Sequence, residues 1–458
     1  MRQVTSLAAV AGLLLTAACK DLHVPDLNAP SLSGLETGVT RSLIATSVQG
    51  LIAESRINAG GVVETFGQFG REGYNLDPSN PESPAPVYVF LDQSINVGWV
   101  TAYRLLKQGN STIASVDGVA DLSTEEREAV KGFVQTLEAL AFLHLIMGND
   151  ASGAAVDVAA KATDPLPDVV GKAQVYQRII QLLDQSATHL NAAGTSFPFE
   201  LPPGFSDFST PATFLTFNKA LRARANIYTK NFTAALTDLE ASFLDTSQPL
   251  TAGVYWDFST QPGDAVNPVF DPTTRQIFAH PSFLANARPK ADGTKDNRAL
   301  TKVAPITPLS RYGFNVSEKL TVYTTANAPI PIIRNEELIL LRAEANLGIG
   351  TVASINTALG DINFIRQNAG GLDPIAGGAW TALTPSQQLD ELLYNKRYSL
   401  FWELGTSWID ARNYNRLAAL PHDRPGDVVF AYFMIPPDEC NQRASNKPAG
   451  CTQRPPAS

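Results

Sequence analysis

The sequence predicts a mainly α-helical fold, in which stacked helix pairs form a scaffold and long, irregular excursions form a second kind of region. Three observations lead to this class. Apolar residues recur at helical spacing over long segments, one helix–turn–helix unit occurs twice, and stretches rich in proline and glycine interrupt the helices. The hydrophobic content of 44% is that of a globular protein, so we expect a substantial buried core.

Two segments, 124–147 and 386–404, carry the clearest helical signal. Their apolar residues return at steps of three and four, which places them on one face of a helix. Each begins with a capping-box pattern that satisfies free backbone N–H groups, namely Ser123 with Glu126 and Thr384 with Gln387. Further helices are predicted over 35–56, 91–115, 172–191, 214–228, 233–243, 334–348 and 353–368.

An internal repeat relates two of these helix pairs. Arg-Ala-Arg-Ala-Asn at 222–226 is echoed at 342–346, and Ala-Leu-Thr-Asp at 235–238 is echoed at 358–361. The offset grows from 120 to 123 residues, which predicts three extra residues in the turn of the second copy. We interpret each copy as helix, turn and helix. Tetratricopeptide-like hairpins have this form, and they bury their faces by stacking on neighbours.

The expected domain organisation is a removable leader over 1–18 and a single domain over 19–458. Clusters of Pro, Gly, Asn and Asp predict loop-rich excursions in this domain, with a short strand near 319–324. Structured loops on a rigid scaffold are common binding sites. The parts expected are a helical scaffold over about 30–190, 214–243 and 334–415, excursions over about 194–213 and 245–333, and a tail over 416–458.

Cys19 follows a short apolar stretch, 7–18, which Arg2 precedes. The stretch is too short to cross the roughly 30 Å of a bilayer core, and it is typical of a signal peptide. A cysteine at the cleavage position indicates lipoprotein processing, although Thr16 stands where the usual lipobox has leucine. Cleavage beside a chance cysteine is the alternative. We expect acyl chains on Cys19 to anchor the protein to a membrane outside the cytoplasm.

Cys440 and Cys451 are the two other cysteines of the chain, and they lie close together near its end. In an oxidising compartment this pair predicts a local disulfide, whereas a metal site would need further ligands at suitable spacing. The formal charge is −9. An acidic protein of this kind argues against nucleic acid as a partner and against electrostatic binding to anionic lipid.

Aromatic residues in loop-like contexts are the best candidates for ligand contact. Sugar rings have apolar C–H faces that stack on flat aromatic rings, while their hydroxyls need polar neighbours. By this reasoning the candidates are Tyr74, Tyr255, Trp256 and Trp380. The alternative for each is that it packs its loop onto the scaffold. If Trp256 contacts ligand, Trp256→Ala should weaken binding and leave the fold intact.

No motif for catalysis, a cofactor or a metal stands out. The five histidines (His23, His144, His189, His280 and His422) form no pair at the helical spacing of zinc ligands. Walker A and nucleophile-elbow sequences are absent. The glycines at 67, 70 and 73 lack the dinucleotide fingerprint, and we assign them to a turn. We therefore predict a binding protein without a cofactor.

Several motifs in the second half of the chain resemble one known family. They are 330–338 (Ile-Pro-Ile-Ile-Arg-Asn-Glu-Glu-Leu), 341–345 (Leu-Arg-Ala-Glu-Ala), 361–366 (Asp-Ile-Asn-Phe-Ile-Arg), 397–405 (Arg-Tyr-Ser-Leu-Phe-Trp-Glu-Leu-Gly), 408–412 (Trp-Ile-Asp-Ala-Arg) and 435–439 (Ile-Pro-Pro-Asp-Glu). The combination resembles the SusD/RagB family of nutrient-binding outer-membrane lipoproteins. One departure is Leu-Gly-Thr-Ser at 404–407, where the family often has Glu-Gly-His-Arg.

The resemblance implies a helical body with four tetratricopeptide-like pairs and a loop-rich ligand face. It also implies a lipid-anchored protein at the outer surface of the outer membrane, which binds a glycan or another nutrient oligomer. Its partner would be a SusC-like TonB-dependent transporter, over which it would act as a lid. No enzyme activity is implied.

Two other functions stay open from the residues alone. One is an α-helical cell-surface carbohydrate hydrolase, which would need two facing carboxylates within about 5–10 Å of each other. The other is a helical-repeat scaffold lipoprotein that binds only protein, which would lack an aromatic ligand pocket.

Overall fold

The computed structural model describes residues 38–91, 95–159, 164–271, 276–443 and 446–456. The expected leader over 1–18, the predicted lipidation site Cys19 and the start of the predicted scaffold lie outside these residues. The division into a leader and one domain therefore stays a prediction.

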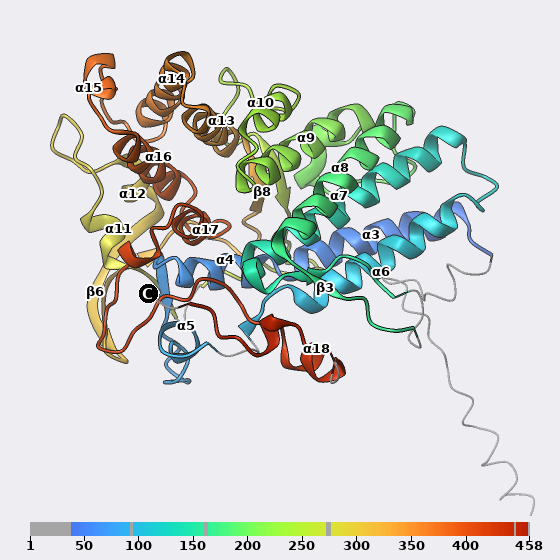
Figure 1. Cartoon of the computed structure of the whole chain (residues 1–458), viewed down its shortest axis with the longest axis horizontal. Helices are drawn as coiled ribbons and strands as arrows, with labels where there is room; N and C mark the ends of the chain where they lie inside the picture. Colours follow the sequence, from blue (N-terminus) through green and yellow to red (C-terminus); the bar gives the residue numbers. More distant parts are fainter. Residues whose placement is uncertain (1–37, 92–94, 160–163, 272–275, 444–445, 457–458) are drawn as a thin grey trace, which may run out of the picture.

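Helix pairs packed side by side form most of the described chain, and neighbouring pairs are in contact along the row (Figure 1). This confirms the predicted mainly α-helical, tetratricopeptide-like class. The four pairs are α3 (Arg41–Ile57) with α6 (Trp99–Val116), α7 (Thr124–Asn149) with α8 (Lys172–Ala192), α9 (Pro211–Tyr228) with α10 (Phe232–Glu240), and α13 (Asn335–Ile349) with α14 (Val352–Asn368). The helices α16 (Pro385–Ser399) and α17 (Thr406–Asn413) continue the row.

Local sequence signals account for where these helices begin. Both predicted capping boxes form, one at Ser123 and Glu126 before α7 and the other at Thr384 and Gln387 before α16. By length and composition, the helical segment Thr124–Ser152 could also cross a membrane. Its most apolar window is 83% buried within the protein, however, because α7 packs against α6, α8 and α9. It is a core helix.

The repeat forms two helix hairpins, but its three extra residues are not in the turn. The turn between α9 and α10 covers 229–231, and the turn between α13 and α14 covers only 350–351. When the two copies are aligned by their repeated residues, α14 begins three residues earlier than α10, and α13 ends one residue later than α9. The insertion therefore lengthens the helices. A left-handed glycine, Gly350 with φ 73°, ends α13 and makes the short turn possible.

The predicted excursion over 245–333 is more regular than its composition indicates. It contributes most of a four-stranded antiparallel sheet in the order β1-β5-β7-β6, and it pairs β4 with β8. The strand expected near 319–324 lies instead over 314–320. The strand bounds are β1 (Gly73–Asn75), β2 (Ala154–Ala155), β3 (Val169–Val170), β4 (Gly253–Trp256), β5 (Ile277–Ala279), β6 (Val303–Arg311), β7 (Phe314–Leu320) and β8 (Ile330–Arg334).

Short helices connect these larger elements. They are α4 (Ala59–Phe69), α5 (Ala85–Tyr88), η2 (Asp150–Ser152), η3 (Pro203–Phe208), α11 (Pro281–Ala285), α12 (Asn297–Lys302), α15 (Gly377–Thr381), η4 (Leu417–Ala419), α18 (Pro437–Gln442) and η5 (Ala449–Cys451). The C-terminal segment runs back beneath the helix pairs, where Phe433 donates its N–H to the Gly148 carbonyl at 2.9 Å (Figure 1). The expected disulfide between Cys440 and Cys451 is present in this segment.

Gly70 lies in the predicted turn, between α4 and β1, whereas the glycines at 67 and 73 serve packing. Gly67 lies within α4 and Gly73 begins β1. A Cβ added at either position would lie 2.5 Å or 2.8 Å from the indole ring of Trp402. Only glycine allows the backbone to approach this buried ring so closely. Trp402 and Trp408 are both core residues of the scaffold.

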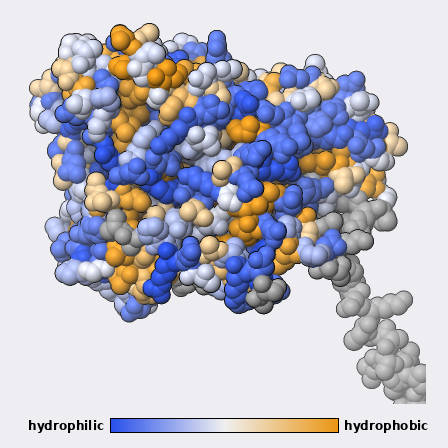
Figure 2. Space-filling view, in the orientation of Figure 1, coloured by the Kyte–Doolittle hydropathy of each residue, from blue (hydrophilic) through white to orange (hydrophobic). Residues whose placement is uncertain are grey.

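The core consists of two apolar clusters. The larger runs from α3 to the C-terminal segment, and the smaller lies among α13, α14, α15 and α16. Figure 2 shows that the face seen in Figure 1 is largely hydrophilic, with separate hydrophobic patches between the polar regions. Apolar side chains are thus concentrated in the interior, as expected for a chain that folds by burying helix faces.

Candidate functional site

Strand β4 places two of the four predicted ligand residues at the junction between scaffold and excursion. It pairs with β8, and the register shifts between Val254 and Tyr255. Neighbouring side chains of a strand point to opposite faces. Accordingly Tyr255 is half-buried at the surface, whereas Trp256 points inward and is 2% exposed.

A groove lies on the Tyr255 side of this strand, with an empty volume of about 550 Å³. We call it the Tyr255 groove. Its walls come from α3, from the η3 turn, from the end of β4 and from the loop that follows. The lining residues are Gln49, Ile52, Ala53, Arg56, Pro202, Phe205, Tyr255, Trp256, Asp257 and Asp264.

Arg56 organises the polar side of the Tyr255 groove. From the last turn of α3, its guanidinium donates to the Asp257 carbonyl at 2.6 Å and binds the Asp264 carboxylate at 2.5 Å. These contacts hold the loop after β4 against α3. Because both partners come from the 245–333 excursion, one arginine fixes the excursion to the scaffold at the groove.

The two carboxylates of the groove are both engaged within the protein. Asp257 accepts a hydrogen bond from the N–H of Gly204, while burial raises the pKa of its carboxyl group. Burial acts in the same direction on Asp264 and is the largest single influence, but the hydrogen bonds from Arg56, the Ala265 N–H and Ser259, together with the charge of Arg56, outweigh it and lower the pKa of Asp264. Both carboxylates therefore help to hold the loop after β4 in place.

The Tyr255 ring supplies a flat surface beside these polar groups. Its hydroxyl donates to the Thr251 carbonyl, which fixes the ring, and burial raises the pKa of Tyr255 to about 12. The phenol is therefore neutral at physiological pH. An aromatic face, apolar neighbours such as Phe205 and a cation–carboxylate pair form the combination expected of a site for a polar ligand with apolar faces.

Trp256 is more deeply buried than its loop-like context indicated, and its predicted ligand contact stays a prediction. Its indole N–H donates to the Ser55 hydroxyl at 3.3 Å, and its ring lies 5.3 Å from the His144 ring. The side chain forms the floor between the Tyr255 groove and a second space beneath α3. Because the ring is buried, Trp256→Ala would leave a cavity and is no longer expected to preserve the fold.

Tyr74 is a core residue and does not join the groove. It is 2% exposed, and its ring packs against Phe314, His280 and Tyr88 at centroid distances of 4.6, 5.1 and 5.9 Å. This burial favours the packing alternative for Tyr74, and its ligand contact stays a prediction. Pairing of β1 with β5 brings this ring under the sheet, because Tyr74 lies opposite Phe278.

Trp380 is also a core residue. It is fully buried in the smaller apolar cluster, and its indole N–H donates to the Ile355 carbonyl at 3.2 Å. The adjacent glycines, Gly377 and Gly378, suggested a loop, but these residues form α15, which packs on α14. The indole anchors this short helix, which favours the packing alternative, and ligand contact by Trp380 stays a prediction.

The comparisons with known proteins bear on this architecture. No family model and no curated protein matches the sequence. Solved structures do match. A SusD superfamily protein from Bacteroides fragilis has a TM-score of 0.66 at 13% identity, covering 88% of this chain and 98% of its own. The chain has the SusD fold.

Two further structures with the SusD fold match nearly their whole length. A SusD superfamily protein from Bacteroides vulgatus has a TM-score of 0.64 at 16% identity, with 89% of this chain and 98% of that one covered. Surface glycan-binding protein A from Bacteroides thetaiotaomicron was solved with laminarihexaose. It has a TM-score of 0.63 at 13% identity, with 89% and 99% covered.

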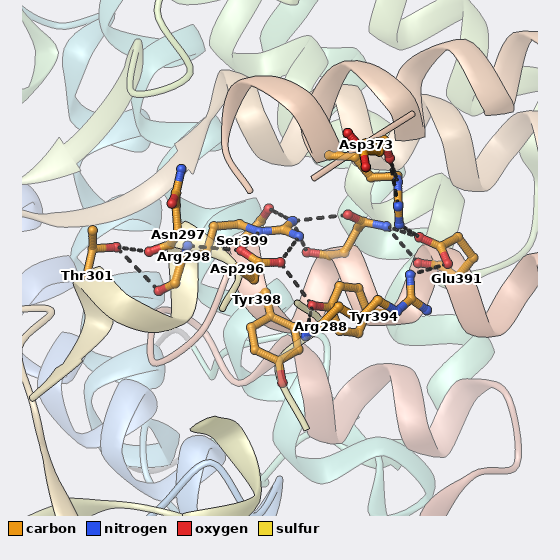
Figure 3. Close-up of polar contacts among 12 residues, drawn as sticks. Arg288, Asp296, Asn297, Arg298, Thr301, Asp373, Glu391, Tyr394, Tyr398 and Ser399 are labelled. Carbon is orange, nitrogen blue, oxygen red and sulfur yellow. Dashed lines mark hydrogen bonds and ion pairs between the residues drawn. The ribbon is translucent and has the colours of Figure 1, made fainter. Parts of the chain in front are cut away.

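A buried polar network elsewhere in this SusD fold attaches the excursion to α16 (Figure 3). Arg298 binds Asp296 through hydrogen bonds of 3.0 and 2.6 Å, and it donates to the Ser399 hydroxyl at 3.0 Å. The hydroxyl of Tyr394 donates to Asp296 at 2.9 Å. Glu391 accepts from two more arginines, Arg288 and Arg366. Because the charged groups of this network bind one another, we infer that it stabilises the fold and does not bind ligand.

Within the described residues, no group of three or more His, Cys, Asp or Glu side chains is arranged to hold a metal ion.

Sequence reasoning identified Tyr255 but missed Arg56, Gln49 and Phe205, which complete the groove. Arg56 follows an apolar helical stripe, where a basic residue also suits the C-terminal end of a helix. Because its position already has this local explanation, the sequence gives no sign that Arg56 binds the loop after β4, 201 residues further along the chain.

Proposed function

We propose that this chain is a surface-exposed lipoprotein that binds a glycan oligomer at the Tyr255 groove and passes it intact to a TonB-dependent outer-membrane transporter. The observation that carries the proposal is the meeting of Tyr255, Phe205 and Arg56 in one groove, on a fold shared with a glycan-binding protein solved with laminarihexaose. Aromatic faces suit the C–H surfaces of sugar rings, and the Arg56–Asp264 pair suits hydroxyl groups.

The membrane and transporter parts of the proposal rest on the sequence. The short leader that ends at Cys19 supports export and acylation, which would place the protein at the outer membrane. Mass spectrometry of the membrane-extracted protein should find acyl chains on Cys19, and Cys19→Ser should release the protein from membranes. Recovery of a non-acylated mature protein would contradict this part. Co-purification of a TonB-dependent transporter with the acylated protein would test the partner.

Binding is tested by calorimetry with laminarihexaose and a panel of other linear oligosaccharides. We expect at least one oligosaccharide to bind, and we expect Tyr255→Ala to weaken that binding about tenfold or more. A matched control is Tyr432→Ala, since Tyr432 is also half-buried but lines no part of the groove. Equal loss in both variants would argue against the groove.

The same samples distinguish a binding protein from the alternative hydrolase. After prolonged incubation, chromatography should return the oligosaccharide at its original length. Shorter products that disappear with Asp257→Asn or Asp264→Asn would replace the binding proposal with a hydrolytic one. If the protein binds no oligosaccharide of the panel, the glycan proposal fails.

A further inference from the structure

A second space lies on the other side of Trp256, between the helices of the first two pairs. Helices α3, α6 and α7 enclose it, and these three helices are in mutual contact (Figure 1). Most of its empty volume of about 420 Å³ is the open mouth, and the inner part has room for only about one or two water-sized groups, such as single hydroxyls. We call it the Trp256 pocket. Its polar lining residues are Glu54, Ser55, Asn58, Thr101 and His144.

Two polar atoms in the Trp256 pocket have no partner within the protein. They are the Oε1 atom of Glu54 and the Nε2 atom of His144, and both are buried. Buried polar atoms are nearly always hydrogen-bonded in folded proteins, so each such exception needs an explanation. Here both unpaired atoms belong to residues that line one open pocket, which points to a bound group as the partner.

The other polar residues of the pocket are already engaged. The Ser55 hydroxyl donates to the Ile52 carbonyl at 2.7 Å and accepts from the Trp256 indole at 3.3 Å. The Asn58 amide donates to the Thr101 hydroxyl. The unsatisfied hydrogen-bonding capacity is thus concentrated on Glu54 and His144, with the Trp256 ring as an apolar wall beside them.

The charges around the pocket favour an uncharged ligand. Burial lowers the pKa of His144 to about 3, and the nearby charge of Arg224 acts in the same direction. His144 is therefore neutral at physiological pH, when its Nε2 atom either accepts or donates according to the tautomer. Burial also raises the pKa of Glu54, while the positive charge of Arg104 opposes that rise and partly balances the carboxylate.

We propose that the Trp256 pocket is a binding subsite for an uncharged hydroxyl-bearing group, held by hydrogen bonds to Glu54 and His144 and packed on the Trp256 ring. Hydroxyl groups fit because each can donate to a carboxylate and can also exchange a hydrogen bond with a neutral imidazole. Two sources have this chemistry, namely the end sugar of a bound glycan and a free polyol. The first rests on the proposed function, because Trp256 also lines the Tyr255 groove.

The test compares variants that remove polarity or space from the pocket. His144→Leu removes the hydrogen bond at similar volume, and Ala141→Leu fills the pocket from the same helix. The control is His189→Leu, since His189 binds Glu128 on α7 and lines no part of the pocket. Circular dichroism verifies that each variant is folded. Glucose and glycerol serve as probes in saturation-transfer NMR, and laminarihexaose is measured by calorimetry.

We expect glucose, glycerol or the end of laminarihexaose to bind the wild type, and we expect His144→Leu and Ala141→Leu to weaken that binding at least tenfold. His189→Leu should bind like the wild type. Preferential loss of laminarihexaose would identify a glycan end, and preferential loss of glycerol would identify a free polyol. Unchanged binding of every probe in folded His144→Leu and Ala141→Leu would overturn the subsite, as would a wild type that binds none of them.

Tyr255→Ala separates this inference from the proposed function. If Tyr255→Ala abolishes laminarihexaose binding while His144→Leu leaves all binding unchanged, the function stands and the subsite is wrong. If the wild type binds no oligosaccharide but still binds glycerol in a manner sensitive to His144→Leu, the glycan function fails. The pocket is then a polyol site.

Discussion

Arg342 binds Asp361 through two hydrogen bonds of 2.9 and 2.6 Å, and this ion pair closes the second repeat hairpin. Its counterpart in the first hairpin is Arg222 with Asp238, joined at 2.6 Å. The partners are 19 residues apart in one copy and 16 in the other, which reproduces the three-residue difference of the repeat. The same contact thus fixes the same pair of helices despite the longer α14.

The Arg342–Asp361 pair should contribute measurably to stability. Asp361 is buried, and Arg342 binds both of its carboxylate oxygens, an arrangement that is stronger than a single exposed contact. A double-mutant cycle with Arg342→Ala and Asp361→Ala should give a coupling energy of about 1–3 kcal/mol in chemical denaturation. The exposed pair Arg416–Asp390 is the control, with an expected coupling of about 0–1 kcal/mol. Equal couplings would contradict this account.

Glu138 should make stability depend on pH. Its Oε1 atom is buried without a hydrogen-bond partner, and burial raises its pKa to about 8, although the charge of Arg178 opposes this. The folded state therefore holds a proton that the unfolded chain releases near pH 4.5. The favourable contribution is fully present below about pH 4.5 and is lost as the pH rises through 8.

Glu138→Gln removes this titration with little change in shape. We expect the variant to exceed the wild type in unfolding free energy by about 1–3 kcal/mol at pH 8, because the buried carboxyl group is costly to ionise and the amide does not ionise. The difference should shrink toward zero at pH 4.5, where the wild-type side chain is also neutral. Glu240→Gln, at an exposed site, should leave the pH profile unchanged. A Glu138→Gln gain that is the same at both pH values would show that charge is not the cause.

Sequence reasoning succeeded for this fold where the signal is local. The capping boxes at Ser123 and Thr384 act within one helical turn, so they identify the starts of α7 and α16 directly. The repeat was visible because both copies use the same small and charged residues at the helix contact. Most of the sheet was missed. Strands β1 and β5 have three residues each and pair across a large sequence separation, such as Gly73 with Ala279, and of the longer β6–β7 hairpin only a strand near 319–324 was predicted.

The candidate site shows the same limit. Composition suggested that four aromatic residues contact ligand, but burial depends on partners that a loop-like context does not reveal. Tyr74 is covered by Phe314, some 240 residues further along the chain. Tyr255 remains accessible only because its neighbour on β4, Trp256, takes the inward position. The alternation of side chains along β4 determines which of Tyr255 and Trp256 is accessible, and the sequence did not predict this strand.

The Cys440–Cys451 disulfide should stabilise the C-terminal segment rather than the helix pairs. It closes a separation of 11 residues, worth about 3 kcal/mol in the chain-entropy account. The bond links two parts of that segment directly, while hydrogen bonds such as the one of 2.6 Å from the Ser152 hydroxyl to the Phe433 carbonyl join the segment to the scaffold. Cys440→Ser with Cys451→Ser should therefore speed amide exchange over 433–451.

Exchange in α13 and α14 is the internal reference for the disulfide variant. The core residues of α14 belong to the smaller apolar cluster, and those of α13 are shared between the two clusters, so protection should be preserved, most clearly in α14. If the loss of protection spread equally to α13 and α14, the disulfide would be part of the global cooperative unit and the local assignment would be wrong.

Substitutions at Trp380 can distinguish a contribution to stability from a contribution to ligand affinity. Its ring is fully buried among α13, α14 and α16, and its N–H bonds the Ile355 carbonyl. Trp380→Ala should cost about 3–5 kcal/mol of unfolding free energy, because it removes a large buried side chain. Trp380→Phe keeps most of the volume and should cost less. At a temperature where both variants are folded, oligosaccharide affinity should equal that of the wild type. A Trp380→Ala protein with wild-type stability and lost affinity would instead place this indole at the ligand.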